Sequence, residues 1–191
     1  KYANRDYIGQ VELKDTIALK RISIYLMMGA GCQFFVSGIL SFIRPLFETL
    51  FSYYDSTVNS LFVADAVVVS VYVIILAPIV EELMLRGILF GRLRHGISFT
   101  VANAIQAIVF GLYHWDVIQG IYAFGIGLLL GFVYEKSRSL LAPILVHVFI
   151  NGSGLLIQGL SIGKYISSLA AVFLGGALLF GGIYLFSNNT D

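Results

Sequence analysis

Long runs of residues without a charged side chain are the feature that most restricts how this chain can fold. Residues 22–43 hold no Asp, Glu, Lys or Arg, and five further segments are uncharged or nearly so. A helix needs about 20 mostly apolar residues to cross the hydrocarbon core, and lipid leaves no partner for open backbone groups. We therefore predict an all-α, polytopic transmembrane helical bundle of about six spans, at residues 22–43, 63–80, 97–113, 117–134, 140–158 and 166–186.

The segments between these spans are short, apart from residues 44–62, which are long enough for an extra helix at the membrane interface. One or two interfacial or half-inserted helices fit this pattern. Residues 1–21 are polar and carry five basic side chains, so we expect a cytoplasmic N-terminal segment and not a signal peptide. Residues 22–187 then form a single transmembrane domain, without an internal repeat.

The basic residues indicate the orientation in the membrane, because cytoplasmic loops are enriched in Lys and Arg. With six spans, one side carries ten of the 12 basic residues, in the N-terminal segment and in regions 86–96 and 135–139. The other side carries Arg44 and Lys164. We predict a multi-pass protein of the cell membrane with both termini in the cytoplasm.

Composition excludes several classes of protein. The chain is 58% hydrophobic and 12% charged, against about 25% charged in soluble domains, so it is neither a typical soluble domain nor disordered. A net charge of +1 argues against a nucleic-acid partner. Cys32 is the single cysteine, so an intrachain disulfide is impossible and no cysteine-based metal site is expected.

Three clusters of polar residues interrupt the apolar segments, and ionisable groups inside a membrane are functional candidates. The first is Glu81-Glu82-Leu-Met-Leu-Arg86, three residues after Pro78, which can kink a helix. Glu82 and Arg86 share a helical face and can form an ion pair, whereas Glu81 points about 100° away. The alternative interpretation is an ordinary helix end at the interface.

The second and third clusters each pair two residues four positions apart. Phe110 and His114 end one span, and His147 and Asn151 lie inside another. The first pair also fits an aromatic belt at the interface, and the second also fits a hydrogen bond between two helices. Together with the glutamates, these side chains suit hydrolysis of an amide bond. A carboxylate and a His can deprotonate water, and a His and an Asn can stabilise an oxyanion.

The predicted depths of these residues in the membrane, counted from the nearest loops, agree for Glu81 and His114 but not for His147. If a helix continues from Glu81 to a turn near Gly96, Glu81 and His114 lie about 23 and 27 Å from that turn. His147 lies about 12 Å deep if the preceding loop is level with Gly96. The mismatch requires tilted, broken or half-inserted helices.

At these residues the sequence resembles the CAAX protease and bacteriocin-processing (CPBP, or Abi) family, which includes the type II CAAX prenyl endopeptidases. The family's pattern is a double Glu followed by Arg, then Phe-x-x-x-His, then His-x-x-x-Asn. The three parts occur here, in that order, as Glu81-Glu82-x-x-x-Arg86, Phe110-x-x-x-His114 and His147-x-x-x-Asn151. The resemblance covers roughly residues 69–156, the protease-like core of the chain.

The resemblance implies an intramembrane endopeptidase acting on a peptide or lipidated protein. Glu81 and His114 would activate the water, with Glu82 sharing acid–base work. His147 and Asn151 would bind the oxyanion, and Arg86 and Phe110 would organise the site. We favour a mechanism without a cofactor. Zinc held by His114, His147 and Glu81 is the alternative, although no His-Glu-x-x-His pair is present.

Two other functions fit parts of the pattern. A non-catalytic immunity protein that binds a bacteriocin peptide is the main alternative, because the resembling family is linked to such immunity. A transporter with a proton relay fits less well, since the sequence shows no inverted repeat. The expected partners are the lipid bilayer and the peptide or lipidated protein. No oligomeric state is selected, although a homo-oligomer fits the glycine pairs near the C-terminus.

The remaining polar residues receive structural interpretations. We expect His95 to be solvated, Asp65 to cap a helix, and Asn103 and Gln106 to form hydrogen bonds between helices or to line the cavity. The glycine pairs 175–176 and 181–182 predict close packing of helices or of two copies.

Overall fold

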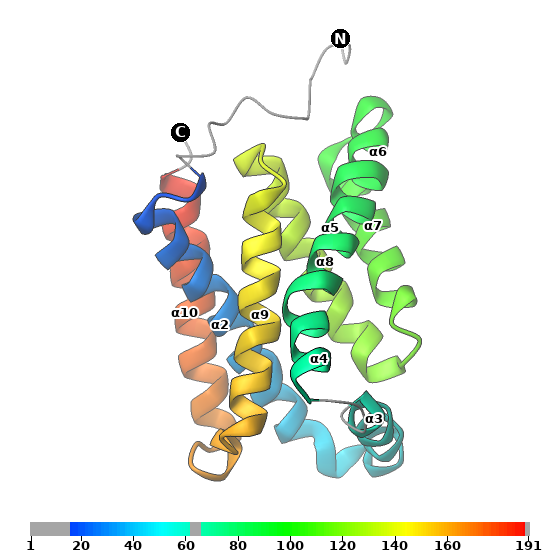
Figure 1. The fold of residues 1–191 in the computed structure, drawn as a ribbon, viewed down its shortest axis with the longest axis vertical. Helices are drawn as coiled ribbons and strands as arrows, with labels where there is room; N and C mark the ends of the chain where they lie inside the picture. The colour runs from blue at the N-terminus through cyan, green and yellow to red at the C-terminus, as the bar shows by residue number, and fades with distance from the viewer. Residues whose placement is uncertain (1–15, 62–65, 190–191) are drawn as a thin grey trace.

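The computed structural model describes residues 16–61 and 66–189, and these residues form a bundle of helices (Figure 1). Among these described residues, five helices are long and apolar enough to cross a membrane, which confirms the predicted all-α membrane fold. They are α2 (Leu19–Ile43) with its extension η1 (Arg44–Leu46), the span Ala66–Gly96, α8 (Val117–Ser137), α9 (Leu141–Gly159) and α10 (Ser168–Asn188). Asp65, expected as a helix cap, lies outside the described residues.

The span Ala66–Gly96 changes its hydrogen-bonding pattern along its length. It consists of α4 (Ala66–Val71), η2 (Tyr72–Leu76), α5 (Ala77–Glu82), η3 (Leu83–Phe90) and α6 (Gly91–Gly96). The segments η2 and η3 are π-helical, and Pro78 lies in α5 between them. Proline cannot donate a backbone hydrogen bond, and π-helical turns often accompany functional sites. The span is therefore irregular on both sides of the glutamate pair.

The third predicted span, residues 97–113, is a shorter helix, α7 (Phe99–Tyr113). Its 15 residues correspond to about 22 Å, less than the roughly 30 Å of the hydrocarbon core. Trp115, with a left-handed φ of 57°, ends the turn after α7. Asp116 then caps α8, where its carboxylate accepts a hydrogen bond of 2.8 Å from the Gln119 amide. This turn brings α7 back against α8, so that the two helices form a hairpin (Figure 1).

The predicted interfacial helix is α3 (Glu48–Leu61), within the long segment after the first span. It lies across one end of the bundle (Figure 1). Arg44 joins it to the end of α2 through Asp55, with N–O distances of 2.7 and 3.1 Å. The start of α2 and the end of α10 meet at the opposite end of the bundle, where Lys20 Nζ donates to Asn189 Oδ1 at 2.6 Å. Which side of the membrane that end faces stays a prediction.

The predicted mismatch in depth has a structural explanation. In Figure 1, α6 extends beyond the start of α9, so the two loops are not level as the estimate assumed. The π-helical segment η3 also lies between Glu81 and Gly96. A π-helix has more residues in each turn than an α-helix, so it advances less per residue. Both differences shorten the separation between Glu81 and His147.

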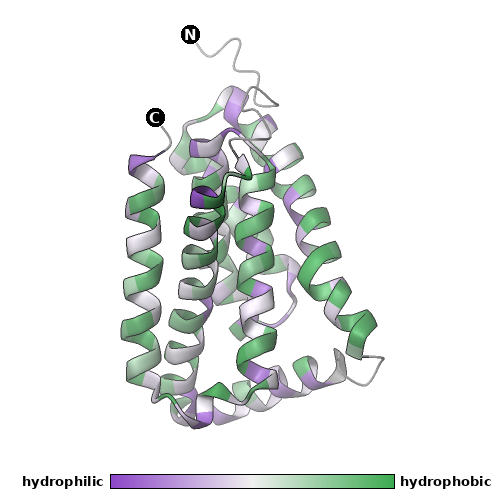
Figure 2. Cartoon of the chain, turned by 60° about the vertical axis from the view of Figure 1, so that its left-hand side comes forward, coloured by the Kyte–Doolittle hydropathy of each residue, from purple (hydrophilic) through white to green (hydrophobic). Residues whose placement is uncertain are grey.

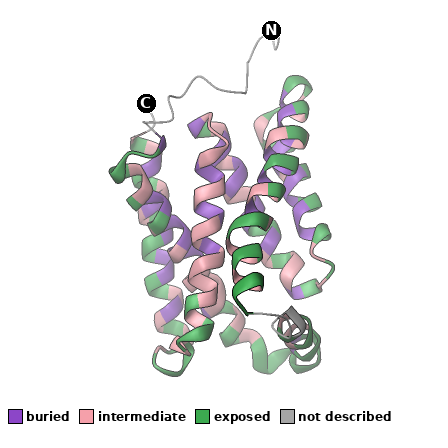
Figure 3. Cartoon of the chain, viewed as in Figure 1, coloured by how far each residue is buried: buried purple, intermediate pink, exposed green. Residues whose placement is uncertain are grey.

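The outside of the bundle is largely apolar (Figure 2), and much of that surface is exposed (Figure 3). Phe173 and Phe180 of α10 are 74% and 60% exposed, and Leu112 of α7 is 72% exposed. Side chains of this kind gathered over several helices mark a surface made for an apolar environment. Lipid therefore surrounds the spans.

Glycines bring α2 and α10 into close contact along their length. A Cβ atom at Gly31 would lie 2.5 Å from the Leu179 nitrogen, and one at Gly175 would overlap the Phe35 nitrogen. Of the two predicted glycine pairs, Gly175 and Gly182 face such tight contacts. Gly181, by contrast, has only the tip of Met27 at 4.0 Å. Small residues allow helix backbones to approach closely in lipid.

This difference predicts opposite outcomes for two neighbouring substitutions. Gly175→Ala should lower the free energy of unfolding by about 1–3 kcal/mol, because the new methyl group displaces the α2 backbone. Gly181→Ala should leave it unchanged or slightly higher, since alanine favours a helix and space is available. Unfolding of the purified proteins in detergent measures both. Equal losses for the two variants would contradict the packing described here.

Candidate active site

A buried ion pair stands at the centre of the polar residues. Arg86 Nη1 donates to Glu82 Oε1 at 2.8 Å, and neither side chain has any solvent exposure. The pair connects the end of α5 to η3, and its four-residue spacing is the one that the sequence predicts. A charge inside a membrane protein is costly unless it is paired. Mutual neutralisation therefore allows a carboxylate and a guanidinium to lie inside this bundle.

Arg86 also contacts two other helices. Its Nη2 donates to the Gly127 carbonyl of α8 at 3.1 Å. Its guanidinium carbon lies 4.9 Å from the centre of the Phe110 ring of α7, a cation–π distance. The guanidinium is thus fixed from three sides by a carboxylate, a carbonyl and an aromatic ring.

His147 of α9 lies between the two glutamates. Its Nδ1 is 2.8 Å from Glu82 Oε1, and its Nε2 is 3.7 Å from Glu81 Oε2. Since Glu82 also accepts the Arg86 hydrogen bond, it is an ionised acceptor, and His147 Nδ1 carries a proton that it donates. The adjacent glutamates therefore face opposite nitrogens of one imidazole. Glu82 is fully buried, whereas the Glu81 side chain is 15% exposed.

His114 follows the last residue of α7 and is oriented by its own helix. Its Nδ1 lies 2.7 Å from the Phe110 carbonyl oxygen, which can only accept. Nδ1 therefore donates, and Nε2 is left as an acceptor. Burial lowers the pKa of His114, the hydrogen bond to Phe110 opposes that shift, and nearby His147 adds to the lowering. A neutral His114 with a free acceptor nitrogen is suited to take a proton.

The Phe110 ring lies between the two histidines. Its centre is 4.7 Å from that of His114 and 5.7 Å from that of His147, edge-on in both cases. Because the same ring also lies under Arg86, Phe110 touches three of the residues that the sequence motifs contain. This contact explains why an aromatic residue precedes the histidine by one helical turn.

Asn151 lies one turn beyond His147 on α9 and has a different partner. Its Nδ2 donates to the Val73 carbonyl of η2 at 2.8 Å. No hydrogen bond within the described part of the chain joins Asn151 to His114 or to either glutamate. The structure thus brings together Glu81, Glu82, Arg86, Phe110, His114 and His147, and it places Asn151 at the edge of this group.

Asn103 and Gln106 form the predicted hydrogen bonds between helices, and these extend the site. Gln106 Nε2 donates to the Gly127 carbonyl at 2.8 Å, the same oxygen that Arg86 contacts. Asn103 Nδ2 donates to the next carbonyl, that of Leu128, at 3.1 Å. Both amides lie on the face of α7 that carries Phe110. In the sequence, the two amide residues could be recognised because they lie in an apolar helix on the same face as Phe110. Nothing in the sequence indicated that the Gly127 carbonyl accepts hydrogen bonds at this site.

The proposed zinc ligands do not form a metal site as they lie. Within residues 16–61 and 66–189, no group of three His, Cys, Asp or Glu side chains is arranged to hold a metal ion. His147 Nδ1 is bound to Glu82 and His114 Nδ1 to Phe110, so each histidine keeps one nitrogen for other work.

Comparison with known proteins finds relatives among membrane proteases. The model of Rce1-like type II CAAX prenyl endopeptidases matches residues 63–153, a little under half of the chain, and these include all seven motif residues. This part of the chain is therefore similar to that family. It is 27% identical over 111 residues, 58% of its length, to YdiL of Bacillus subtilis, whose name describes a membrane peptidase. It is 29% identical over 93 residues, 46% of its length, to the membrane-embedded CAAX protease MroQ of Staphylococcus aureus.

The matched segments cover 44% and 38% of those two relatives, so the chain spans less than half of each. No solved structure matches it. The chain is thus a multi-pass membrane homologue of CAAX proteases.

The different surroundings of the two glutamates predict different effects on stability. Glu82→Ala should lower the free energy of unfolding by about 3–5 kcal/mol, because it leaves Arg86 buried and unpaired. Glu81→Ala should cost less than about 1 kcal/mol, since Glu81 is partly exposed and makes no short hydrogen bond. Unfolding in detergent compares the two. The double variant Glu82→Ala/Arg86→Met should recover much of the loss, and an unchanged loss would argue against the ion pair as its cause.

Proposed function

We propose that this protein is a membrane-embedded endopeptidase that hydrolyses a peptide bond with water activated by Glu81 and His114. The observation that carries the proposal is the arrangement of Glu81 and Glu82 around the His147 ring. One carboxylate is fully buried and bound to Arg86, so its charge is committed to holding the histidine. The other, Glu81, is partly exposed and is held only by the longer 3.7 Å contact with His147 Nε2, so it can act as a base.

On the base side, Glu81 takes the proton from the attacking water. The Nε2 atom of His114 is a second acceptor for the same water, because its Nδ1 is committed to the Phe110 carbonyl. The water oxygen forms a bond to the carbonyl carbon of the substrate. The abstracted proton then passes to the leaving amine as the carbon–nitrogen bond breaks, so that an acid and an amine are released.

On the oxyanion side, His147 and Asn151 donate to the oxygen that becomes negative. His147 does so through a protonated Nε2 while its Nδ1 stays bound to Glu82. Asn151 keeps one amide hydrogen beyond the one given to Val73. Donors held in fixed positions in a dry site stabilise developing charge more than mobile water does.

The substrate in this proposal is a membrane-associated peptide or a lipidated protein. The name of MroQ, a membrane-embedded CAAX protease, supports this class. The site's position among membrane spans also favours a substrate that reaches it from the membrane or its surface.

Activity measurements test the proposal directly. Wild type, Glu81→Gln and His114→Ala are purified in detergent and offered quenched fluorescent peptides, with and without a lipid chain. Loss of an acid–base group typically costs about 10²–10⁴-fold in rate, and we expect a loss of this order in kcat/KM for both variants. His95→Ala, at the exposed end of α6, is the control and should keep wild-type activity.

Three outcomes would contradict part or all of this proposal. An active Glu81→Gln variant would overturn the assignment of the base. Inhibition of the wild type by a zinc chelator would restore metal as part of the reaction. A wild type that cleaves no peptide, but protects cells from a bacteriocin even with all five predicted catalytic residues replaced, would favour the non-catalytic immunity protein.

A further inference from the structure

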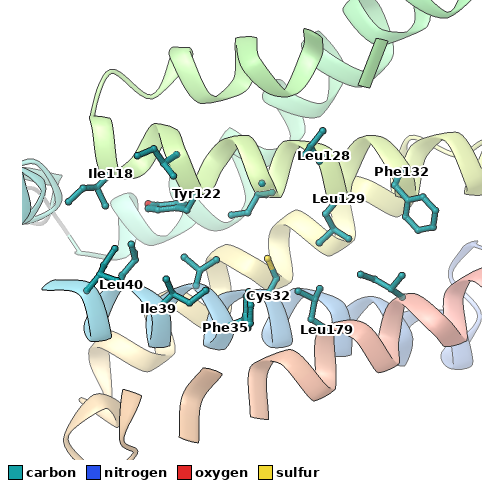
Figure 4. A pocket seen from close by; sticks show the side chains of 16 residues that line it. Cys32, Phe35, Ile39, Leu40, Ile118, Tyr122, Leu128, Leu129, Phe132 and Leu179 are labelled. Carbon is teal, nitrogen blue, oxygen red and sulfur yellow. The ribbon is translucent and has the colours of Figure 1, made fainter. Parts of the chain in front are cut away.

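A second site lies in the bundle, apart from the polar residues. It is a cavity of about 600 Å³ between α2, α8 and α10. Side chains of α8, among them Tyr122 and Leu129, face Cys32 and Phe35 of α2 across it (Figure 4). Leu179 of α10 closes one side.

The cavity and the candidate active site lie on opposite faces of α8. On α8 the cavity is lined by residues 118, 121, 122, 125, 126, 128, 129 and 132, and the middle of this face runs through residues 118, 125 and 132. The Gly127 carbonyl, which Arg86 and Gln106 contact, belongs to a residue two positions from both 125 and 129. Residues two positions apart on a helix are rotated by about 200° about its axis, so Gly127 faces away from residues 125 and 129. The helix therefore separates the two sites.

The residues that line the cavity favour a hydrocarbon chain as its ligand. The lining is apolar throughout, apart from the Tyr122 hydroxyl and the Cys32 thiol. A bound water needs two to four polar partners, which such a lining lacks. Ile121, one of the lining residues, is 70% exposed, so the cavity opens at the surface of the bundle. Lipid surrounds the spans and is the available source of a chain that fills the space.

The shape of the cavity matches one fatty chain. It runs from Ile43 and Ile118, at the end of the bundle crossed by α3, to Phe132 and Leu179. The distance from residue 118 to residue 132 along α8 is about 21 Å, somewhat more than the roughly 15 Å of hydrocarbon in one leaflet. Since α3 fits an interfacial helix, its end of the cavity is the end that a lipid headgroup would occupy.

Charges at that end favour a headgroup without net negative charge. The ionisable side chains described on α3 and on the adjoining ends of α2 and α8 include three acids, Glu48, Asp55 and Asp116. Two cations among the described residues lie at this end of the bundle: Arg44, which is bound to Asp55, and Lys164 in the loop between α9 and α10, so the acids exceed the cations by one. This acidic excess disfavours an anionic lipid.

We propose that the cavity binds one acyl chain of a zwitterionic phospholipid from the leaflet on the α3 side. The bound chain fills the space between α2 and α8 and supports the face of α8 opposite to Gly127. The proposal does not depend on peptide hydrolysis, so it stands or fails separately from the proposed function.

Gly125 allows a matched test. It lines the cavity, and a Cβ atom added to it would meet nothing within 4 Å, so Gly125→Leu begins a side chain in open space at the cavity wall. Gly159→Leu, at the end of α9, makes the same change where space is also open but outside the cavity. Each protein is reconstituted in phosphatidylcholine vesicles that contain a phosphatidylcholine with a photoactivatable acyl chain, and cross-linked peptides are mapped by mass spectrometry.

We expect the wild type and Gly159→Leu to cross-link strongly at the cavity-lining segments of α2 and α8. Gly125→Leu should lose at least fivefold of that yield while keeping the cross-links on the exposed face of α7. Cross-links spread evenly over all lipid-facing helices, or an unchanged yield in Gly125→Leu, would overturn the proposal. So would cross-links between two copies of the chain through these residues, because the cavity would then be an interface.

Cys32 provides a measurement that needs no substitution, since it is the only cysteine and lines the cavity. Its reaction with pyrenyl maleimide should be at least tenfold slower in phosphatidylcholine vesicles than in protein stripped of lipid by detergent. Equal rates in the two preparations, with helical content unchanged, would contradict a bound acyl chain.

Discussion

The arrangement of the polar core depends on the buried pair of Glu82 and Arg86. Neither charge is tolerable alone among apolar helices, and both remain because each neutralises the other and makes further hydrogen bonds. Those further bonds reach α8 through the Gly127 carbonyl and α9 through His147. Phe110 adds α7 through its ring. One ion pair thus sets the relative positions of the helices that supply the candidate catalytic groups.

Polar contacts of this kind have a special role in lipid. Burial of apolar surface does not drive one helix against another there, because lipid tails are as apolar as the side chains. The helices around the site are instead joined by hydrogen bonds to backbone carbonyls, from Gln106 to Gly127, from Asn103 to Leu128 and from Asn151 to Val73. The same side chains that hold the helices together therefore also fix the geometry of the reacting groups.

The sequence predicted those features that depend on local spacing. Runs of uncharged residues located the spans, and four-residue spacing paired Glu82 with Arg86 and Phe110 with His114. The sequence did not predict features that depend on contacts between distant segments. Nothing in the spacing shows that His147 meets both glutamates, that Asn151 donates to Val73, or that Gly127 accepts two side chains. The third span was predicted from its apolar residues at 97–113, but Ser98 caps the helix at its start, so that α7 has 15 residues.

The cavity lies between two differently assembled parts of the bundle. On one side, glycines bring α2 and α10 into backbone contact, as Gly31 shows against Leu179. On the other side, α7 and α8 are joined by amide side chains. Helix α9 bridges both parts, since Gly29 of α2 lies so close to it that a Cβ atom would be 2.5 Å from the Phe149 Cβ, while His147 reaches Glu82. The histidine between the two glutamates is thus carried by a helix that packs closely on α2 at Gly29 and is hydrogen-bonded to α5 through Glu82.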